Sequence, residues 1–418
     1  MDLFANTNWP LLGCDPELFV VRQAGKVSKR IAAVPSTLIL AEGKVVDPSS
    51  SYGAYSYLTR DGVQIELHAG GVSGCRQSLG VYLRETFRVL DATVKTARHT
   101  LKDPSITASF QPMVTLSSRD MAKLPPDARE LNCKPSLNAY GREAILRDGS
   151  TYPIRTASGH LHLGSRLFQA GHNIDMDKAV QLFDLWVGVP CVLVDQDPSQ
   201  AIRRETYGRA GEYRLPPHGL EYRVPGNFWL KDYRLMSFVF ALAKQATAIC
   251  EALIPAKSTL RPCINSKRIY EMLMGKVDLT EVERVINTND FNGAWKIYTE
   301  SILPVTRQIA TQQGLYSATA DNFEYFVDQI HAKASASGGG LRAWFYLDDI
   351  EVLQRWLAHQ AYTVGWETFL IDEVGDRRAR KKFTGIVLDP QKDVARTPAP
   401  VIATRRSRTA DRSLPLAA

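Results

Sequence analysis

Four separated stretches of the chain alternate apolar and polar residues and place acidic or histidine side chains among apolar ones. Alternation with a period of two is typical of β-strands, because successive side chains point to opposite faces. A carboxylate in an apolar strand is costly to bury unless a positive group neutralises it. The stretches are 11–22, 63–67, 158–164 and 219–225, and the residues able to bind a metal ion are Asp15, Glu17, Glu66, His160, His162 and Glu221. The pattern therefore predicts a sheet whose strands together supply a metal site.

The stretch 206–229 adds arginines and aromatic residues to this pattern. Glu221 and Arg223 lie two positions apart, so on a strand they share one face, where one can bind a metal ion and the other an anion. Arginine binds phosphate and carboxylate groups in a fork geometry. The arginines in and just before this stretch are therefore candidate anion-binding residues: Arg203, Arg204, Arg209, Arg214 and Arg223.

Each of these features has an ordinary explanation when it is taken alone. Asp15-Pro16-Glu17 is compatible with a simple turn, and Glu66 with the solvent face of an amphipathic strand. His160 and His162 can be structural, or zinc ligands of a hydrolase. The arginines can form a solvated surface. The four stretches in this order favour a common site.

Together the four motifs resemble those of the glutamine synthetase and glutamate–cysteine ligase superfamily, and most closely the phage-type carboxylate–amine (COOH–NH2) ligases, type 2. GCDPELF is similar to the first metal strand and VQIE to the Gln-x-Glu motif. SGHLHLG resembles Ser-Gly-x-His-x-His, and GLEYRVPGNFW resembles Glu-x-Arg-x-Pro with a following Asn. The resemblance covers most of residues 11–235. It implies an α+β fold in which a curved antiparallel sheet forms a half-barrel with packed helices and a helical C-terminal part.

The resemblance also implies an activity, namely ATP-dependent amide bond formation through an acyl phosphate. The substrates would be a small-molecule or peptide carboxylate and an amine, and the cofactors ATP with two or three Mg²⁺ or Mn²⁺ ions. Carried over by position, Glu17 and Glu66 would bind the metal ion nearer the acceptor. Asp15, His160 and Glu221 would bind the metal ion on the nucleotide phosphates, and His162 would lie near these phosphates.

The arginines receive two expected roles from the same resemblance. Arg223 would bind the carboxylate substrate or the transferred phosphoryl group, so we expect it to be catalytic, together with Arg209 and Arg214. The candidates for binding the triphosphate are Arg203, Arg204, Arg209 and Arg214. They do not align one to one with the superfamily's arginines.

The sequence departs from the superfamily at two positions that affect the metal count. The first motif is Asp-x-Glu where Glu-x-Glu is frequent, and the shorter Asp15 side chain shifts the metal ion or admits a water. Glutamine synthetases carry a further acidic ligand eight positions before the glutamate of Gln-x-Glu. Here that position is Leu58.

Charge and composition indicate a globular chain with a distinct C-terminal tail. Of 51 basic and 44 acidic residues, 11 and 4 lie in residues 376–418, so 1–375 carry equal numbers of both signs. We expect a catalytic domain over 1–375, with the motif-bearing sheet in 11–235 and a helical part in 236–375, and a basic, disordered tail over 376–418. The neutral body does not favour nucleic-acid binding, whereas the tail has the composition for it.

The N-terminus lacks the features of a signal peptide, no apolar run reaches about 18 residues, and the six cysteines form no CxxC pair. We therefore expect a cytoplasmic protein (host cytoplasm if phage-encoded) without a membrane span. The oligomeric state stays open.

Local patterns predict further elements of secondary structure. We expect a turn at Asp61-Gly62, a lid near 69–74, and irregular structure with loops and short strands over 118–155. A strand is predicted at 44–47. The predicted helices are 75–101, 175–193 with Asp175 as its cap, 228–254, 267–274, 280–288, 293–313, 321–332 and 346–371. The run 334–340 is expected to be a flexible connector.

Two other functions remain as alternatives. One is a protein that keeps the fold as a binding or structural module without catalysis. The other is a zinc hydrolase that uses His160 and His162, although the sequence lacks a motif such as HExxH. Stoichiometric zinc in the purified protein would favour the hydrolase.

Overall fold

A computed structural model describes residues 10–23, 31–50, 53–73, 76–129, 131, 136–169, 174–195, 197–231, 233–260 and 266–305. The helices expected at 321–332 and 346–371, the connector 334–340 and the tail 376–418 lie outside these residues.

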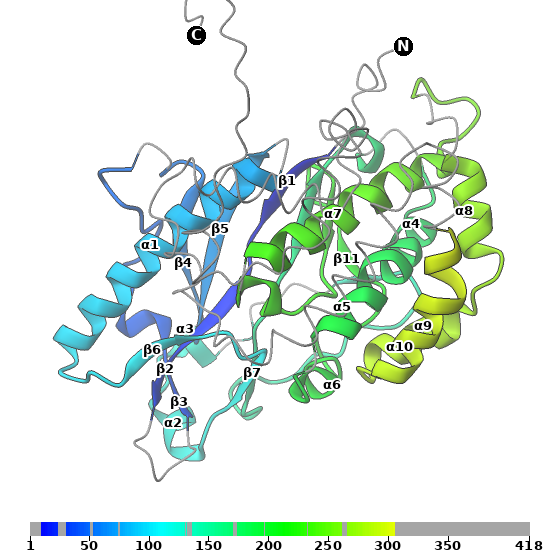
Figure 1. Ribbon diagram of the computed structural model, residues 1–418. Coiled ribbons are helices and arrows are strands. Elements are labelled where there is room, and N and C mark those ends of the chain that lie inside the picture. The colour runs from blue at the N-terminus through cyan, green and yellow to red at the C-terminus, as the bar shows by residue number, and fades with distance from the viewer. Residues whose placement is uncertain are drawn as a thin grey trace, which may run out of the picture.

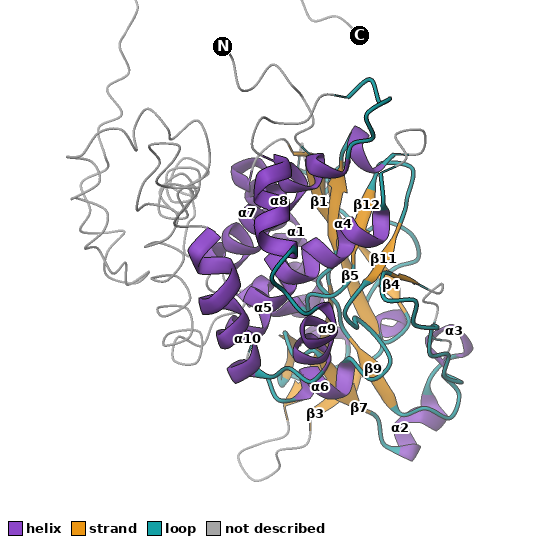
Figure 2. Ribbon diagram, turned by 90° about the vertical axis from the view of Figure 1, so that its right-hand side faces the viewer, coloured by secondary structure: helices purple, strands orange, loops and turns teal. Residues whose placement is uncertain are grey.

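The described part of the chain is built on a ten-stranded antiparallel sheet that stays open, as Figures 1 and 2 show. Its order is β3-β2-β5-β1-β10-β12-β11-β8, with β4 added beside β5 and β6 beside β2. The strands are β1 Leu11–Cys14, β2 Glu17–Gln23, β3 Ile31–Val34, β4 Ser56–Asp61, β5 Gln64–Ser73, β6 Ile106–Ser109, β8 Leu137–Asn138, β10 Leu161–Gly164, β11 Glu212–Arg214 and β12 Leu220–Tyr222. A separate ribbon pairs β7 Met113–Thr115 with β9 Ile154–Thr156. The predicted α+β class with a large antiparallel sheet is confirmed.

Helices form a layer on one face of this sheet, and the strands lie to the other side of this layer in Figure 2. They are α1 Arg76–Thr100, α4 Met176–Phe183, α5 Val189–Val194, α7 Tyr233–Cys250, α8 Ser266–Met274, α9 Leu279–Asn287 and α10 Phe291–Ile297. The short helices are α2 Ser118–Lys123, α3 Pro126–Arg129 and α6 Ser199–Arg203. None of the described helices is long and apolar enough to span a membrane.

Alternation along the strands divides the sheet into an apolar and a polar face. Leu12, Ile65, Leu67, Leu161, Leu163 and Leu220 are fully buried, and they form one core with Leu79, Leu83, Phe87 and Leu90 of α1. The intervening strand residues point away from the helices. The six metal-competent residues lie at such positions in the strands or directly beside a strand end. Because the apolar face of the sheet packs on the helices, these side chains point to the polar face.

A second, smaller cluster covers one end of the polar face. Phe19 and Val21 follow Glu17 on the same side of β2 and pack with Val114, Leu116, Leu124 and Ala128. These partners lie in β7 and α3 or directly after β7 and α2, within the region 118–155 or next to it. The region expected to hold loops and short strands thus contains strands β8 and β9 and, in addition, two short helices, and it shields the apolar end of β2.

Several predicted boundaries were wrong in ways that the structure explains. The strand expected over 11–22 is interrupted at Asp15-Pro16, since proline lacks the N–H that a continuous ladder requires. Residues 44–47 form no strand, only an isolated bridge between Val45 and Leu58. The lid expected near 69–74 is instead part of strand β5, which continues to Ser73. Within it, Gly70 has a φ of 89° and pairs with Gly13 of β1.

The predicted helices fit more closely. The helix expected over 75–101 is confirmed as α1, and Asp175 caps α4 by accepting a hydrogen bond from the Lys178 N–H. The helix expected at 228–254 begins later, at Tyr233, after a 3-10 turn over Asn227–Lys231.

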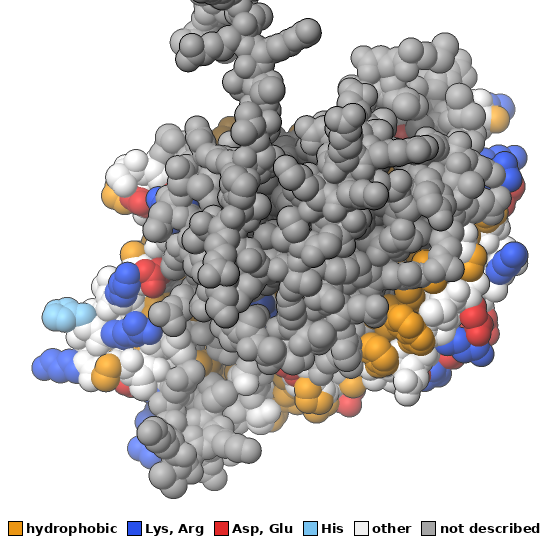
Figure 3. Space-filling model, in the orientation of Figure 1, with side chains coloured by type: hydrophobic (Ala, Val, Ile, Leu, Met, Phe, Trp, Pro, Cys, Tyr) orange, Lys and Arg blue, Asp and Glu red, His pale blue; other side chains and the backbone are white. Residues whose placement is uncertain are grey.

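Over α1 and over α8, α9 and α10, side chains of both charge signs are interspersed on the face shown in Figure 3.

Candidate metal and anion site

Strand register gathers the site on the polar face. Gly13 pairs with His162, His162 with Glu221, and Glu221 with Arg214, so these four positions form a row across β1, β10, β12 and β11. Residues directly opposite in an antiparallel ladder point to the same face. Gly13 has no side chain, which leaves space in this row beside His162.

One acidic and imidazole cluster lies at this row. His162 Nε2 is 2.8 Å from Asp15 Oδ1, and His160 Nδ1 is 3.4 Å from Asp15 Oδ1. The same nitrogen of His160 is also 3.4 Å from Glu221 Oε1. Single ligand atoms of Asp15, His162 and Glu221 all lie within 4.8 Å of one another, the spacing of a metal site. The structure therefore brings together the residues expected at the nucleotide-side ion, and it adds His162 to them.

A second cluster of carboxylates lies beside the first. Glu17 and Glu66 are paired positions of β2 and β5. Glu17 is fixed by its Oε2, which accepts a 3.0 Å hydrogen bond from the Ser158 N–H, and by its carbonyl, which accepts one from Asn227 Nδ2. Glu66 Oε2 accepts from Thr59 and lies 3.1 Å from His68 Nε2.

Asp61 joins the second cluster, although the sequence predicted it as a turn residue. It pairs with Gln64 at the end of the β4–β5 hairpin and so shares the face of Glu66. Burial and the charges of Glu66 and Asp15 raise the pKa of Asp61 to about 6. The hairpin register, counted back from Gln64, is the feature of the sequence that would have identified it.

The pKa shifts indicate a site with excess negative charge. Burial, and then the charges of Asp61, Glu66 and Asp15, raises the pKa of Glu17 well above its usual range. Burial also favours the neutral form of Asp15, but His162 and His160 lower the pKa of that carboxyl well below normal. Asp15 in turn raises the pKa of His162 against the effect of burial.

These observations fit a divalent cation. Buried Asp15 Oδ1 and His162 Nε2 approach each other without forming a well-directed hydrogen bond. Carboxylate oxygens suit Mg²⁺ and Mn²⁺, and imidazole nitrogens suit transition-metal ions, so this mixed set of donors fits a divalent cation. Burial and then the charges of Asp61, Glu66 and Asp15 raise the pKa of Glu17, and a cation bound here would offset this negative charge.

The five candidate arginines separate into two groups. Arg223 Nη1 donates to Glu221 Oε1 at 3.0 Å, and Arg214 Nη1 lies 3.7 Å from the same oxygen. These two belong to the site. Arg209 instead donates to Glu212 and to the Glu143 carbonyl, which anchors its loop.

The hydrogen-bond partners of Arg203 and Arg204 are not among the residues of the metal-competent clusters. Arg203 is fully buried and donates to the carbonyls of Val224 and Pro225. Arg204 donates to the Ile286 carbonyl and to Asn289. Both guanidinium groups thus support the packing of the loops, and the expected binding of a triphosphate by them stays a prediction.

Two further residues contact the site imidazoles from irregular segments. Tyr207 Oη lies 3.0 Å from His160 Nε2, and His218 Nε2 lies 3.0 Å from His162 Nδ1. Each metal-facing histidine is therefore bonded through its other ring nitrogen. No periodic pattern in the sequence marks residues outside strands and helices, so neither was predicted.

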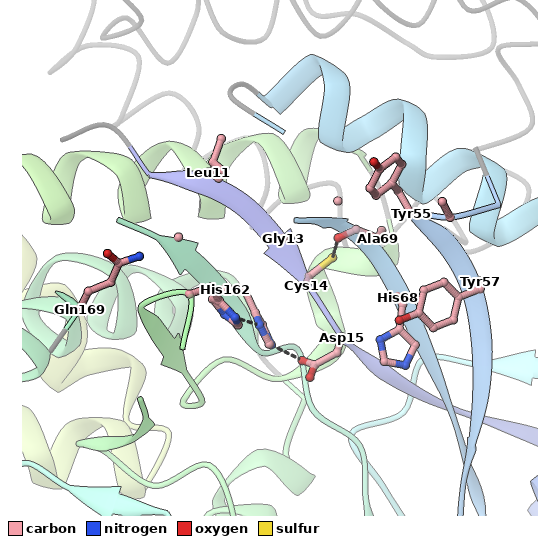
Figure 4. Close-up of a pocket in the computed structure, with 14 residues that line it drawn as sticks. Leu11, Gly13, Cys14, Asp15, Tyr55, Tyr57, His68, Ala69, His162 and Gln169 are labelled. Carbon is pink, nitrogen blue, oxygen red and sulfur yellow. Dashed lines mark hydrogen bonds and ion pairs between the residues drawn. The ribbon is translucent and has the colours of Figure 1, made fainter. Parts of the chain in front are cut away.

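A pocket of about 360 Å³ opens beside Asp15, with Gly13 and Gly70 among its lining residues. In Figure 4 it lies between two ring pairs, with Asp15 near the middle. On one side His162 stacks on His218, with ring centroids 5.0 Å apart; on the other side Tyr57 stacks on His68 at 4.4 Å. The pocket thus combines aromatic surface with direct access to the metal-competent cluster.

Comparison with known families supports the resemblance found in the motifs. A family model described as phage phiEco32-like COOH.NH2 ligase-type 2 matches residues 145–272. This segment contains His160, His162, Glu221 and Arg223, and the match confirms the predicted resemblance there. A search of curated proteins found no match.

Proposed function

We propose that the protein is an ATP-dependent carboxylate–amine ligase that requires divalent metal ions. The observation that carries this proposal is the convergence of Asp15, Glu17, Glu66, His160 and Glu221 on one sheet face beside Arg223. The match of residues 145–272 to a carboxylate–amine ligase family supports the reaction class.

The two clusters suit two metal ions. Asp15, His160 and Glu221, with His162 beside them, would bind one ion; Glu17 and Glu66, joined by Asp61, would bind a second. When bound, such ions neutralise the negative charge of phosphate groups. The adjoining pocket would take the nucleotide, because it opens at Asp15 and its stacked rings offer flat surfaces to a base.

The proposed reaction has two steps. A substrate carboxylate oxygen forms a bond to the terminal phosphorus of ATP, and ADP leaves. An amine nitrogen then bonds to the acyl carbon, phosphate leaves with the former carboxylate oxygen, and the nitrogen loses a proton. Phosphoryl transfer of this kind depends on positioning and on charge stabilisation.

The arginines would supply the charge stabilisation from the protein. Arg223 is buried and fixed, so it is preorganised to bind an anion, while Arg214 is partly exposed at the same oxygen of Glu221. A cation bound to Glu221 would compete with both guanidinium groups for its carboxylate. Arg223 and Arg214 would then be available to the carboxylate or to the transferred phosphoryl group.

The test is ADP release by purified protein with Mg²⁺ or Mn²⁺ across pairs of carboxylates and amines. We expect turnover that needs both substrates, and ATP binding that Glu17→Gln and Glu221→Gln weaken. Glu205→Gln, an exposed control of the same charge change, should bind ATP normally. Absence of ATP binding by the wild type would refute the ligase, and stoichiometric zinc with hydrolysis would favour the hydrolase.

A further inference from the structure

Tyr207 connects the metal-competent cluster to the candidate anion-binding arginine. It lies between α6 and β11, and its hydroxyl is 3.0 Å from His160 Nε2 and accepts a 2.8 Å hydrogen bond from Arg223 Nη2. The guanidinium carbon of Arg223 lies 5.2 Å from the centre of the Tyr207 ring. One side chain thus contacts both a metal-competent imidazole and an anion-binding group.

The other nitrogen of His160 faces two carboxylates. His160 Nδ1 lies 3.4 Å from both Asp15 Oδ1 and Glu221 Oε1. In the metal-free protein, a proton on Nδ1 would face these two oxygens, and Nε2 would then accept a hydrogen bond from the Tyr207 hydroxyl.

Metal binding through Nδ1 requires the opposite tautomer. Nδ1 must then offer its lone pair, so the proton resides on Nε2 and is donated to the Tyr207 oxygen. A hydroxyl can take both roles, whereas phenylalanine can take neither. Arg223 is a donor in both states because guanidinium has no acceptor.

We infer that Tyr207 is a positioning residue that holds His160 in the orientation for metal binding and fixes Arg223 relative to that ion. This inference rests on the proposed metal-binding role of His160. Partners on the second nitrogen of a metal-bound histidine orient the ring and fix its tautomer. Tyr207 thereby couples occupancy of the cation site to the arrangement of the anion site.

The first test is Mn²⁺ affinity, measured by electron paramagnetic resonance on the full chain. Tyr207→Phe should weaken Mn²⁺ binding on the order of 10-fold, the effect typical of partners of metal-bound residues. Tyr213→Phe is the matched control, since its hydroxyl donates to Asp177, away from the site. Wild-type affinity in Tyr207→Phe would overturn the inference and leave the ligase proposal intact.

A second measurement uses the unmodified protein and so does not depend on how the variant folds. Histidine ¹⁵N spectra should show His160 protonated at Nδ1 without metal and at Nε2 after Mg²⁺ is added. If the tautomer of His160 in the wild type does not change while Mg²⁺ binds, the inferred change of tautomer is refuted. A wild type that binds neither Mn²⁺ nor Mg²⁺ would refute the proposed function as well.

Discussion

Glu17 and Glu66 are direct partners in the β2–β5 ladder, so two carboxylates share one face of the sheet at the shortest cross-strand spacing. Like charges opposite each other destabilise a sheet. Burial and neighbouring charges raise the pKa of Glu17, which shows that its ionised form is disfavoured here without a cation. A bound divalent ion would convert this repulsion into coordination.

Glu66→Gln should therefore stabilise the metal-free protein and reduce its stabilisation by metal, because only the ion at Glu17 and Glu66 loses a ligand. Removing one charge from the pair is expected to raise the free energy of unfolding by about 0.5–1 kcal/mol in chelator. The hydrogen bond from Thr59 can be kept by the amide oxygen. Denaturant unfolding in chelator and in Mg²⁺ measures both effects, with Glu205→Gln as control. A variant that is less stable in chelator and is stabilised by Mg²⁺ as strongly as the wild type would contradict this account.

Substitution of Arg203 should lower the stability of the protein, whereas substitution of Arg214 should weaken ATP binding. Arg203→Met removes the arginine hydrogen bonds to the Val224 and Pro225 carbonyls and leaves Pro225 with the Gly159 N–H, which should lower the free energy of unfolding by about 1–3 kcal/mol. Arg214→Met removes a partly exposed group and should weaken ATP binding with little loss of stability. Unfolding curves and nucleotide titrations distinguish the two. Normal stability of Arg203→Met would mean that the arginine is not structural.

Asp184 should make stability depend on pH. Its carboxylate is fully buried and accepts a 2.7 Å hydrogen bond from the Tyr222 hydroxyl, and burial raises its pKa to about 7. The folded state then retains a proton that the unfolded state loses above about pH 4. The contribution of Asp184 to stability is thus greatest below pH 4 and is lost as the pH rises to about 7.

Asp184→Asn removes that dependence without removing the acceptor for Tyr222. Relative to the wild type, it should gain on the order of 2–4 kcal/mol between pH 4 and pH 8. The test is the free energy of unfolding of both proteins, measured across this pH range. The titration of other groups cancels in the difference between the two proteins. Identical pH profiles of the two proteins would show that Asp184 titrates normally.

The sequence predicted the parts of the fold and site that follow strand periodicity. The sheet, α1, the cap of α4 and the grouping of Asp15, Glu17, Glu66, His160 and Glu221 were all visible as alternating or helical patterns. Periodicity assigns a residue to a face, and four strands with acidic or histidine residues on one face need only be adjacent to form a cluster.

What the sequence did not reveal depends on irregular backbone and on distant contacts. Arg203 and Arg223 are both arginines of one region, and only the tertiary structure shows that one donates to backbone carbonyls and the other to Glu221. Tyr207 and His218 reach their histidines from loops, where residue spacing carries no directional information. Asp61 was hidden because an Asp-Gly pair is also a common turn.

Anomalous diffraction from crystals grown with Mn²⁺ and a non-hydrolysable ATP analogue tests the central claim most directly. We predict one Mn²⁺ ion coordinated by Asp15, His160 and Glu221, with the nucleotide phosphates beside it and Arg223 within hydrogen-bonding distance of an anion. Glu221→Gln should lose this ion. Nucleotide bound away from the polar face, or Mn²⁺ absent from these residues, would contradict the account.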